Sequence, residues 1–223
     1  MTEAGAGFRQ DGSKEREGTM LDSVRASYVD GYARALATAL QDGEATDRAG
    51  SRVPLDDVVR WTAATARRAH DAGGKLMFVG NGGSATTASH MATDYNKNGN
   101  LRTLSLNDSS MLTCLANDYS FADVFAKQVE FHARPGDLLV AISSSGKSPN
   151  ILNAARTARG LGCTILTMSG FGADNPLRRE GDMNVYLPSD FYGIVEIGHL
   201  ALCHAILDYS MEQDGRGAAR RRD

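Results

Sequence analysis

The feature that most constrains this chain is a regular alternation between short apolar runs and longer stretches of helical periodicity. Five short runs lack a clean apolar–polar alternation, as expected of strands buried on both faces, and they span residues 76–79, 101–106, 138–142, 164–168 and 183–187. Helical stretches lie between and after them, near residues 85–96, 109–116, 121–132, 149–160 and 192–211. This alternation predicts an α/β fold in which helices cover both faces of a parallel sheet.

Two further helices are predicted before the first of these strands. In the first helix, apolar residues recur at helical spacing; they are Leu21, Val24, Tyr28, Tyr32, Ala35, Leu36 and Ala39. The second begins near Pro54, with Asp56 and Asp57 in a first turn where the helix dipole favours negative charge. Gly73 and Gly74 then end this helix.

Length and composition predict a single folded domain. A chain of 223 residues with 42% hydrophobic content can bury one full-sized core. Residues 1–19 are rich in glycine and charge, with few apolar side chains, so we expect them to be disordered. We expect the same of a basic tail at 213–223, which leaves residues 20–212 as the domain.

Composition also excludes several classes of function. With 23% charged residues and a net charge of −3, the chain lacks the electrostatic footprint of a nucleic-acid-binding protein. No apolar run approaches the roughly 20 residues that span a bilayer, and the N-terminal residues do not follow the pattern of a signal peptide. Cys114, Cys163 and Cys203 lie in apolar runs without a C-x-x-C spacing, which predicts buried, reduced thiols in a cytoplasmic protein.

Two loops rich in glycine and serine follow the first and third predicted strands, and each leads directly into a helix. In a parallel sheet such loops lie at the ligand-binding edge, and a helix N-terminus offers free N–H groups and a positive dipole end to an anion. The loops therefore predict a phosphate site formed by Asn81, Gly82, Gly83, Ser84, Ser143, Ser144, Ser145 and Ser148. Ser148 before Pro149 also suits simple helix capping, but capping requires only one of the four serines.

The first loop also satisfies a dinucleotide fingerprint, Gly80-x-Gly82-x-x-Ala85, with Asp108 as a candidate ribose ligand. We consider a dehydrogenase the weaker interpretation. The gap to Asp108 is longer than the usual 20 or so residues, two helices precede the strand, and the serine loop has no place in that scheme.

Carboxylates and histidines recur on two of the predicted helices. His90 and Asp94 are four residues apart and share a helix face, while Glu196 and His204 are eight apart on one side of the last helix. If the helices face one cleft, these groups form either a site for a divalent ion such as zinc or an acid–base pair that moves a proton. Spacing alone leaves open that these four side chains simply face water. We expect His70 and His132, at the ends of other helices, to be structural.

Several blocks occur together in one order: GNGGSATTASHMATDYNK (80–97), NDYSFADVF (117–125), AISSSGKSPN (141–150) and the terminal helix. Over roughly residues 21–212 the chain resembles the sugar isomerase (SIS) domain family, and within it the phosphoheptose isomerases. The resemblance implies a three-layer αβα sandwich around a five-stranded parallel sheet, flavodoxin-like, with two extra N-terminal helices. It also implies a homotetramer with active sites shared between subunits.

The resemblance assigns roles to individual residues. It places the phosphate on Ser143, Ser144, Ser145 and Ser148 and the sugar near the loop 81–84 and Asp108. It implies metal ligands, often for zinc, at His90, Asp94, Glu196 and His204, with Asp94 and His204 catalytic. Asp94 stands where the family has a glutamate, Glu196 where it has a glutamine and Gly193 where it has an aspartate. Because Asp94 is one methylene shorter than the family's glutamate, the reach of the base is shorter by about 1.5 Å.

The implied function is isomerisation of a sugar phosphate, sedoheptulose 7-phosphate to D-glycero-D-manno/altro-heptose 7-phosphate, through an enediol. The alternative is a non-catalytic SIS protein that binds a sugar phosphate or a protein partner as a regulator, as in the replication-initiation activators of this fold. The pair Asp94 and His204 favours the enzyme, because a binding module has no need of an acid and a base together.

Overall fold

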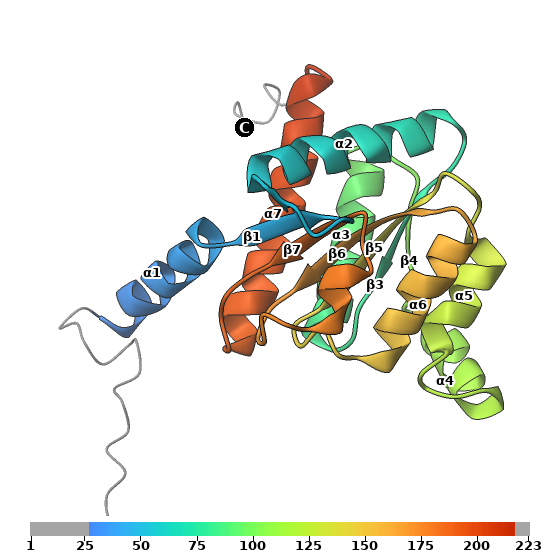
Figure 1. Cartoon of the computed structure of the whole chain (residues 1–223). Coiled ribbons are helices and arrows are strands. Elements are labelled where there is room, and N and C mark those ends of the chain that lie inside the picture. The colour runs from blue at the N-terminus through green and yellow to red at the C-terminus, as the bar shows by residue number, and fades with distance from the viewer. Residues whose placement is uncertain (1–26, 217–223) are drawn as a thin grey trace, which may run out of the picture. The chain divides into compact units, whose positions relative to one another are not determined.

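The computed structural model describes residues 27–216 (Figure 1). The described residues divide into two compact units within helix α1 (Tyr28–Gln41), one ending at Ala35 and the other beginning at Leu36. The predicted disordered segment 1–19 lies outside the described residues, as does the part of the basic tail from 217 onwards. The predicted domain boundaries at 20 and 212 therefore stay predictions.

The larger unit is built on a sheet of seven strands in the order β2-β1-β7-β6-β5-β3-β4. The five predicted runs form its parallel part, which confirms the α/β class: β3 (Leu76–Val79), β4 (Thr103–Ser105), β5 (Leu138–Ser143), β6 (Thr164–Ser169) and β7 (Met183–Tyr186). Counted among themselves these strands have the order 2-1-3-4-5, which is that of flavodoxin-like folds.

The sheet differs from the predicted five strands by a hairpin that extends it along β7. Strands β1 (Glu44–Asp47) and β2 (Arg52–Val53) are antiparallel, and β1 pairs antiparallel with β7. The hairpin is short, charged and half exposed, so it lacks the apolar run that marks a buried strand. The residues of its turn are typical of a tight turn. The Ser51 N–H donates to Asp47 Oδ1 at 2.8 Å, and Gly50 has a φ of 85°.

Helices cover both faces of the sheet, as predicted (Figure 1). One layer contains α2 (Leu55–Asp71), α3 (Gly83–Lys97) and α7 (Tyr192–Gln213), and the other contains α4 (Ser109–Asp118), α5 (Val124–His132) and α6 (Pro149–Gly160). A short 3₁₀ helix, η1 (Pro176–Arg179), lies between β6 and β7. Pro54 precedes α2 as expected, since its fixed φ suits a helix start and its missing N–H costs nothing there.

The strands are buried on both faces, and their side chains alternate between two cores. In β3, Leu76 and Phe78 enter the core under α2, α3 and α7, whereas Met77 and Val79 enter the core under α5 and α6. In the first core the Tyr95 hydroxyl of α3 donates to the Cys203 carbonyl of α7 at 3.0 Å. This contact helps to hold α3 beside α7, and that pair of helices carries the site described below.

The cysteines only partly follow the prediction of buried thiols. Cys163 and Cys203 are buried and free, and burial raises their thiol pKa values to about 11 and about 12. Cys114 is exposed, because its apolar run is the half-covered face of α4, so that prediction was wrong. Within residues 27–216, no helix combines the length and the apolar character needed to cross a membrane.

Candidate active site

The two glycine- and serine-rich loops lie next to each other because β3 and β5 are neighbours in the sheet. In a sheet of this order, the crevice beside the first strand is the usual ligand site. Here the loop after β3 is joined to the first turn of α6 by a reciprocal pair of amide hydrogen bonds. Asn81 Nδ2 donates to Asn150 Oδ1, and Asn150 Nδ2 donates to Asn81 Oδ1, both at 2.9 Å.

A cavity of about 240 Å³ opens between these loops. Its lining contains all the predicted residues of the two loops, together with Tyr192 and Glu196 of α7: Asn81, Gly82, Gly83, Ser84, Ser143, Ser144, Ser145 and Ser148. A larger cavity of about 540 Å³ lies at the opposite edge of the sheet, between Lys75, Arg102 and Arg134, and no predicted site residue lines it. We assign the site to the smaller cavity, because it lies at the carboxyl ends of the parallel strands.

Asp108 does not line this cavity. It is the N-cap of α4, where its Oδ1 accepts a hydrogen bond from the Met111 N–H at 2.9 Å. This local cap accounts for Asp108 in the described structure. Its predicted contact with substrate stays a prediction.

Glycines shape the first loop by removing Cβ atoms that would collide. A Cβ at Gly80 would lie 2.5 Å from the Ser84 backbone, and one at Gly83 would lie 2.2 Å from Glu196 Oε2. Gly82 has a φ of 53°, which a residue with a side chain rarely adopts. The Glu196 carboxylate therefore lies against the first turn of α3, where the helix dipole stabilises negative charge.

The second loop presents hydroxyl groups rather than using them as helix caps. Ser148 is at the N-cap position of α6, but its side chain makes no capping hydrogen bond. Instead, the Ser143 hydroxyl donates to Ser148 Oγ at 3.3 Å. The capping interpretation of Ser148 is therefore wrong, and phosphate binding by this loop, whose residues line a cavity at a helix N-terminus, stays a prediction.

Three of the four predicted metal ligands come together between α3 and α7. Ligand atoms of His90, Asp94 and His204 all lie within 4.8 Å of one another. His90 Nε2 is 3.6 Å from Asp94 Oδ2, and the two imidazole centroids are 5.3 Å apart. Two imidazoles and one carboxylate with room for further ligands are a donor set that fits a divalent metal ion, so this group could hold one.

Glu196 is not part of that group. It precedes His204 by eight residues on α7, a rise of about 12 Å, and its carboxylate lies at Gly83 instead. Similarly, His90 follows Gly83 by seven residues on α3, a rise of about 10 Å. The cavity and the three-residue group thus lie on the same two helices, about two turns apart.

Sequence reasoning missed Tyr192, whose ring lines the cavity and packs edge-on against Phe171 with centroids 4.7 Å apart. His199, three residues after Glu196 on α7, is buried outside this group, with Nε2 3.1 Å from the Ser169 carbonyl oxygen, and burial lowers its pKa to about 4. His70 is structural as predicted, since its Nδ1 accepts from the Arg102 N–H at 3.1 Å.

The family model that matches this chain is described as the SIS domain and covers residues 55–170. Fold and site together therefore define an SIS-domain protein. The phosphoheptose isomerase of Solidesulfovibrio magneticus is 40% identical over 199 residues, spanning 84% of this chain and 90% of that protein. The chain belongs to the phosphoheptose isomerase family, and it is a sugar-phosphate isomerase.

Solved structures agree with this placement. The phosphoheptose isomerase of Neisseria gonorrhoeae has a TM-score of 0.70 at 28% identity, covering 82% of this chain and 95% of that one. The phosphoheptose isomerase of Francisella tularensis also has a TM-score of 0.70, at 25% identity, covering 82% of this chain and 96% of that one. These relatives favour the enzyme over the non-catalytic regulator.

Proposed function

We propose that this enzyme interconverts sedoheptulose 7-phosphate and D-glycero-D-manno/altro-heptose 7-phosphate through an enediol. One observation carries the proposal: α3 and α7 contribute to both parts of the site. The serine-lined cavity lies at the start of these two helices, and His90, Asp94 and His204 lie about two turns further along them. A ligand that engages both must extend over about 10–12 Å. An open-chain heptose with a terminal phosphate has that length, whereas a triose or tetrose phosphate is too short.

In this proposal the phosphate binds the loop 143–148. The hydroxyls of Ser143 and Ser148 are 3.3 Å apart and rotate to fit phosphate oxygens, and the N-terminus of α6 adds its dipole. The Glu196 carboxylate makes the neighbouring loop a poor place for a second negative charge. The sugar hydroxyls are therefore assigned to the loop 81–84 and the phosphate to the serines.

Asp94 is assigned as the base that moves a proton between C1 and C2, and His204 as the group that exchanges a proton with the sugar oxygens. The 3.6 Å contact with His90 Nε2 orients the Asp94 carboxylate. The shorter side chain of aspartate is compatible with this role because α3 and α7 bring all three ligand atoms within 4.8 Å. Proton transfer then needs only a modest approach of the substrate.

His90, Asp94 and His204 would also hold the metal ion, for which zinc is the best fit to two imidazoles and a carboxylate. When bound, such an ion supplies Lewis-acid polarisation of the sugar carbonyl. Asp94 has two carboxylate oxygens, so a metal contact and proton transfer do not exclude each other. Glu196, which was predicted to be a metal ligand, is assigned here as a substrate contact because it lines the cavity.

The proposal includes a cytoplasmic homotetramer in which a neighbouring subunit covers the site. His90 is half exposed, and proton transfer from carbon is favoured where water is excluded. Large apolar side chains beside the cavity are exposed at the start of α7: Phe191, Tyr192 and Ile197. A cluster of this kind is typical of a surface that another protein chain covers.

The test is incubation with sedoheptulose 7-phosphate in deuterated water, followed by NMR. The expected result is an aldose product together with solvent deuterium at the carbon that gains the proton. Asp94→Asn and His204→Ala should each lower kcat by 10²-fold or more, roughly the contribution of general acid–base catalysis. Both variants should still bind inorganic phosphate. A matched control is His132→Ala, an exposed histidine on α5 that should leave turnover unchanged.

If the wild-type enzyme binds the ester but neither converts it nor exchanges a proton, the regulator is the better description. If Asp94→Asn retains most of the activity, the assigned base is wrong.

A further inference from the structure

The loop that follows β6 packs against the serine loop and holds two of its carbonyl groups. The Gly170 N–H donates to the Ser144 carbonyl at 2.9 Å, and the Leu177 N–H donates to the Gly146 carbonyl at 3.2 Å. These bonds leave the serine hydroxyls out of the contact. The segment 170–177 is therefore a support for the back of the serine loop.

Asn175 is the buried centre of this support. Its side chain is 1% exposed, and Nδ2 lies within hydrogen-bonding distance of Ser169 Oγ at 3.2 Å, the Gly170 carbonyl at 3.3 Å and the Gly172 carbonyl at 2.9 Å. These contacts fix the rotation of the amide. Among the residues that the structure describes, Oδ1 has no hydrogen-bond partner.

Oδ1 lies instead against Gly146, in the middle of the serine loop. A Cβ built on Gly146 would be 2.0 Å from this oxygen, and Gly146 has a φ of 61°. An acceptor buried without a donor costs free energy, so the surrounding contacts must hold Oδ1 in this position. Here its position blocks the space beside Gly146 and thereby limits where the turn between Ser145 and Ser148 can go.

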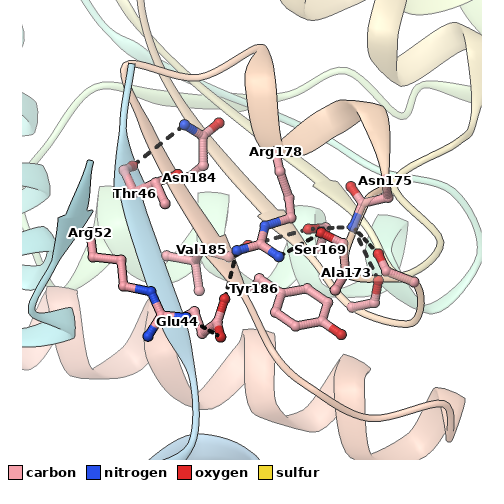
Figure 2. Close-up of polar contacts among 12 residues, drawn as sticks. Glu44, Thr46, Arg52, Ser169, Ala173, Asn175, Arg178, Asn184, Val185 and Tyr186 are labelled. Carbon is pink, nitrogen blue, oxygen red and sulfur yellow. Dashed lines mark hydrogen bonds and ion pairs between the residues drawn. The ribbon is translucent and has the colours of Figure 1, made fainter. Parts of the chain in front are cut away.

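The loop that carries Asn175 is anchored on its other side (Figure 2). Arg178 donates to the Ala173 carbonyl at 2.6 Å, pairs with Glu44 of β1 at 2.8 Å, and lies over the Tyr186 ring at 4.3 Å from its centroid. The hairpin at the sheet edge thus holds η1 and the loop before it. Because these contacts hold the loop before η1 in place, Asn175 stays against Gly146 and does not move away from it.

We propose that Asn175 is a positioning residue for phosphate binding: it holds the serine loop, through Gly146, in the conformation that presents its hydroxyls to the anion. The proposal rests on the proposed function only in taking the loop 143–148 as the phosphate site. Asn175 does not line the cavity, so it acts through the loop and not by contact with the ligand.

The test compares Asn175→Ala with a matched control, Asn184→Ala. Asn184 is a second asparagine at the same end of the chain and is 2% exposed. Its Oδ1 accepts from Thr167 Oγ1 at 2.7 Å and from the Gly181 N–H at 2.8 Å, and its Nδ2 donates to the Thr46 carbonyl at 3.4 Å (Figure 2). These hydrogen bonds do not involve the serine loop. Both substitutions remove a buried, hydrogen-bonded amide, so both should lower thermal stability.

Only the variant at 175 should change phosphate binding. Titration calorimetry with inorganic phosphate should show an affinity about tenfold weaker for Asn175→Ala, because a small misplacement of binding groups has large effects, and an unchanged affinity for Asn184→Ala. With the sugar phosphate, KM should rise by a similar factor while kcat stays within about threefold, the pattern of lost uniform binding. Should Asn175→Ala not fold, Asn175→Ser, which also removes Oδ1 from the space beside Gly146 and adds no charge, carries the test and should weaken phosphate binding by a similar factor.

Gly146→Ala gives a reciprocal measurement. It should weaken phosphate binding in the wild-type background, and the loss should be smaller in the background of Asn175→Ala, where the added methyl has space. Equal phosphate affinity in the variants at 175 and 184 would overturn the proposal. Phosphate binding can be measured without turnover. Failure to isomerise a heptose phosphate would therefore contradict the proposed function but would not affect the comparison of phosphate affinities between the variants at 175 and 184.

Discussion

Asn81 and Asn150 pair through both donors and acceptors of their side-chain amides, at 2.9 Å each, and so tie the loop after β3 to the first turn of α6. Asn150 is 2% exposed, so water does not replace a lost partner easily. Asn81 lines the cavity, and the turn that Asn150 belongs to follows directly on the serine loop at the other side. We therefore expect the pair to affect the width of the site as well as stability.

Asn150→Ala should lower the free energy of unfolding by about 1–3 kcal/mol, because the Asn81 amide is left partly unpaired, and should raise KM for the sugar phosphate. Urea unfolding and steady-state kinetics measure the two effects. Asn153→Ala is the control on the same helix, since its amide donates to the Ala122 carbonyl at 3.0 Å, away from the cavity. A KM that rises equally in both variants would contradict a specific role for the pair.

Metal content should separate Glu196 from the other predicted ligands. His90→Ala and His204→Ala should each lose most of a bound zinc equivalent, measured by elemental mass spectrometry, because each removes one of three ligands whose atoms lie within 4.8 Å of one another. Glu196→Ala should keep the metal, because that carboxylate lies at Gly83. Loss of zinc from Glu196→Ala would show that Glu196 is a ligand after all.

Stability should fall below neutral pH because of His199. Burial lowers its pKa from 6.5 to about 4, so the unfolded chain binds the proton first. The stabilisation of the folded state that arises from this lowered pKa is complete above pH 6.5 and is lost as the pH falls toward 4. Between pH 7 and pH 4.5 the loss is about 2.5 kcal/mol. The free energy of unfolding of His199→Gln should change less over that interval, and equal pH profiles would contradict the buried, neutral histidine.

Only one of the three cysteines should react in the native enzyme. Cys114 is exposed, and its hydrogen bond to the Asp118 carboxylate at 3.5 Å raises its thiol pKa. Cys114→Ser should abolish alkylation at pH 8, and Asp118→Asn should accelerate it because more thiolate forms. Alkylation is followed by intact mass, with labelling of all three cysteines in urea as the control. A second labelled site in the native state would argue against the burial of Cys163 and Cys203.

The sequence by itself determined the features that depend on local periodicity. Burial on both faces marks a parallel strand directly, so all five predicted runs became strands, while the half-exposed hairpin from Glu44 to Val53 was missed. Helix geometry alone places His90 and Asp94 on one face, because residues four apart always lie one turn apart. The sequence also predicted the two loops that line the cavity, 80–84 and 143–148, because each begins where an apolar strand ends.

Only the tertiary structure decided which of these features meet. His204 reaches His90 because α7 packs beside α3, and no local pattern records which helices are neighbours. Glu196 lies at Gly83 because that residue has no Cβ to exclude the carboxylate. Asn175 supports Gly146 from another loop for the same reason. Contacts between distant segments depend on how whole elements pack, and packing is a property of the complete fold rather than of any stretch of chain.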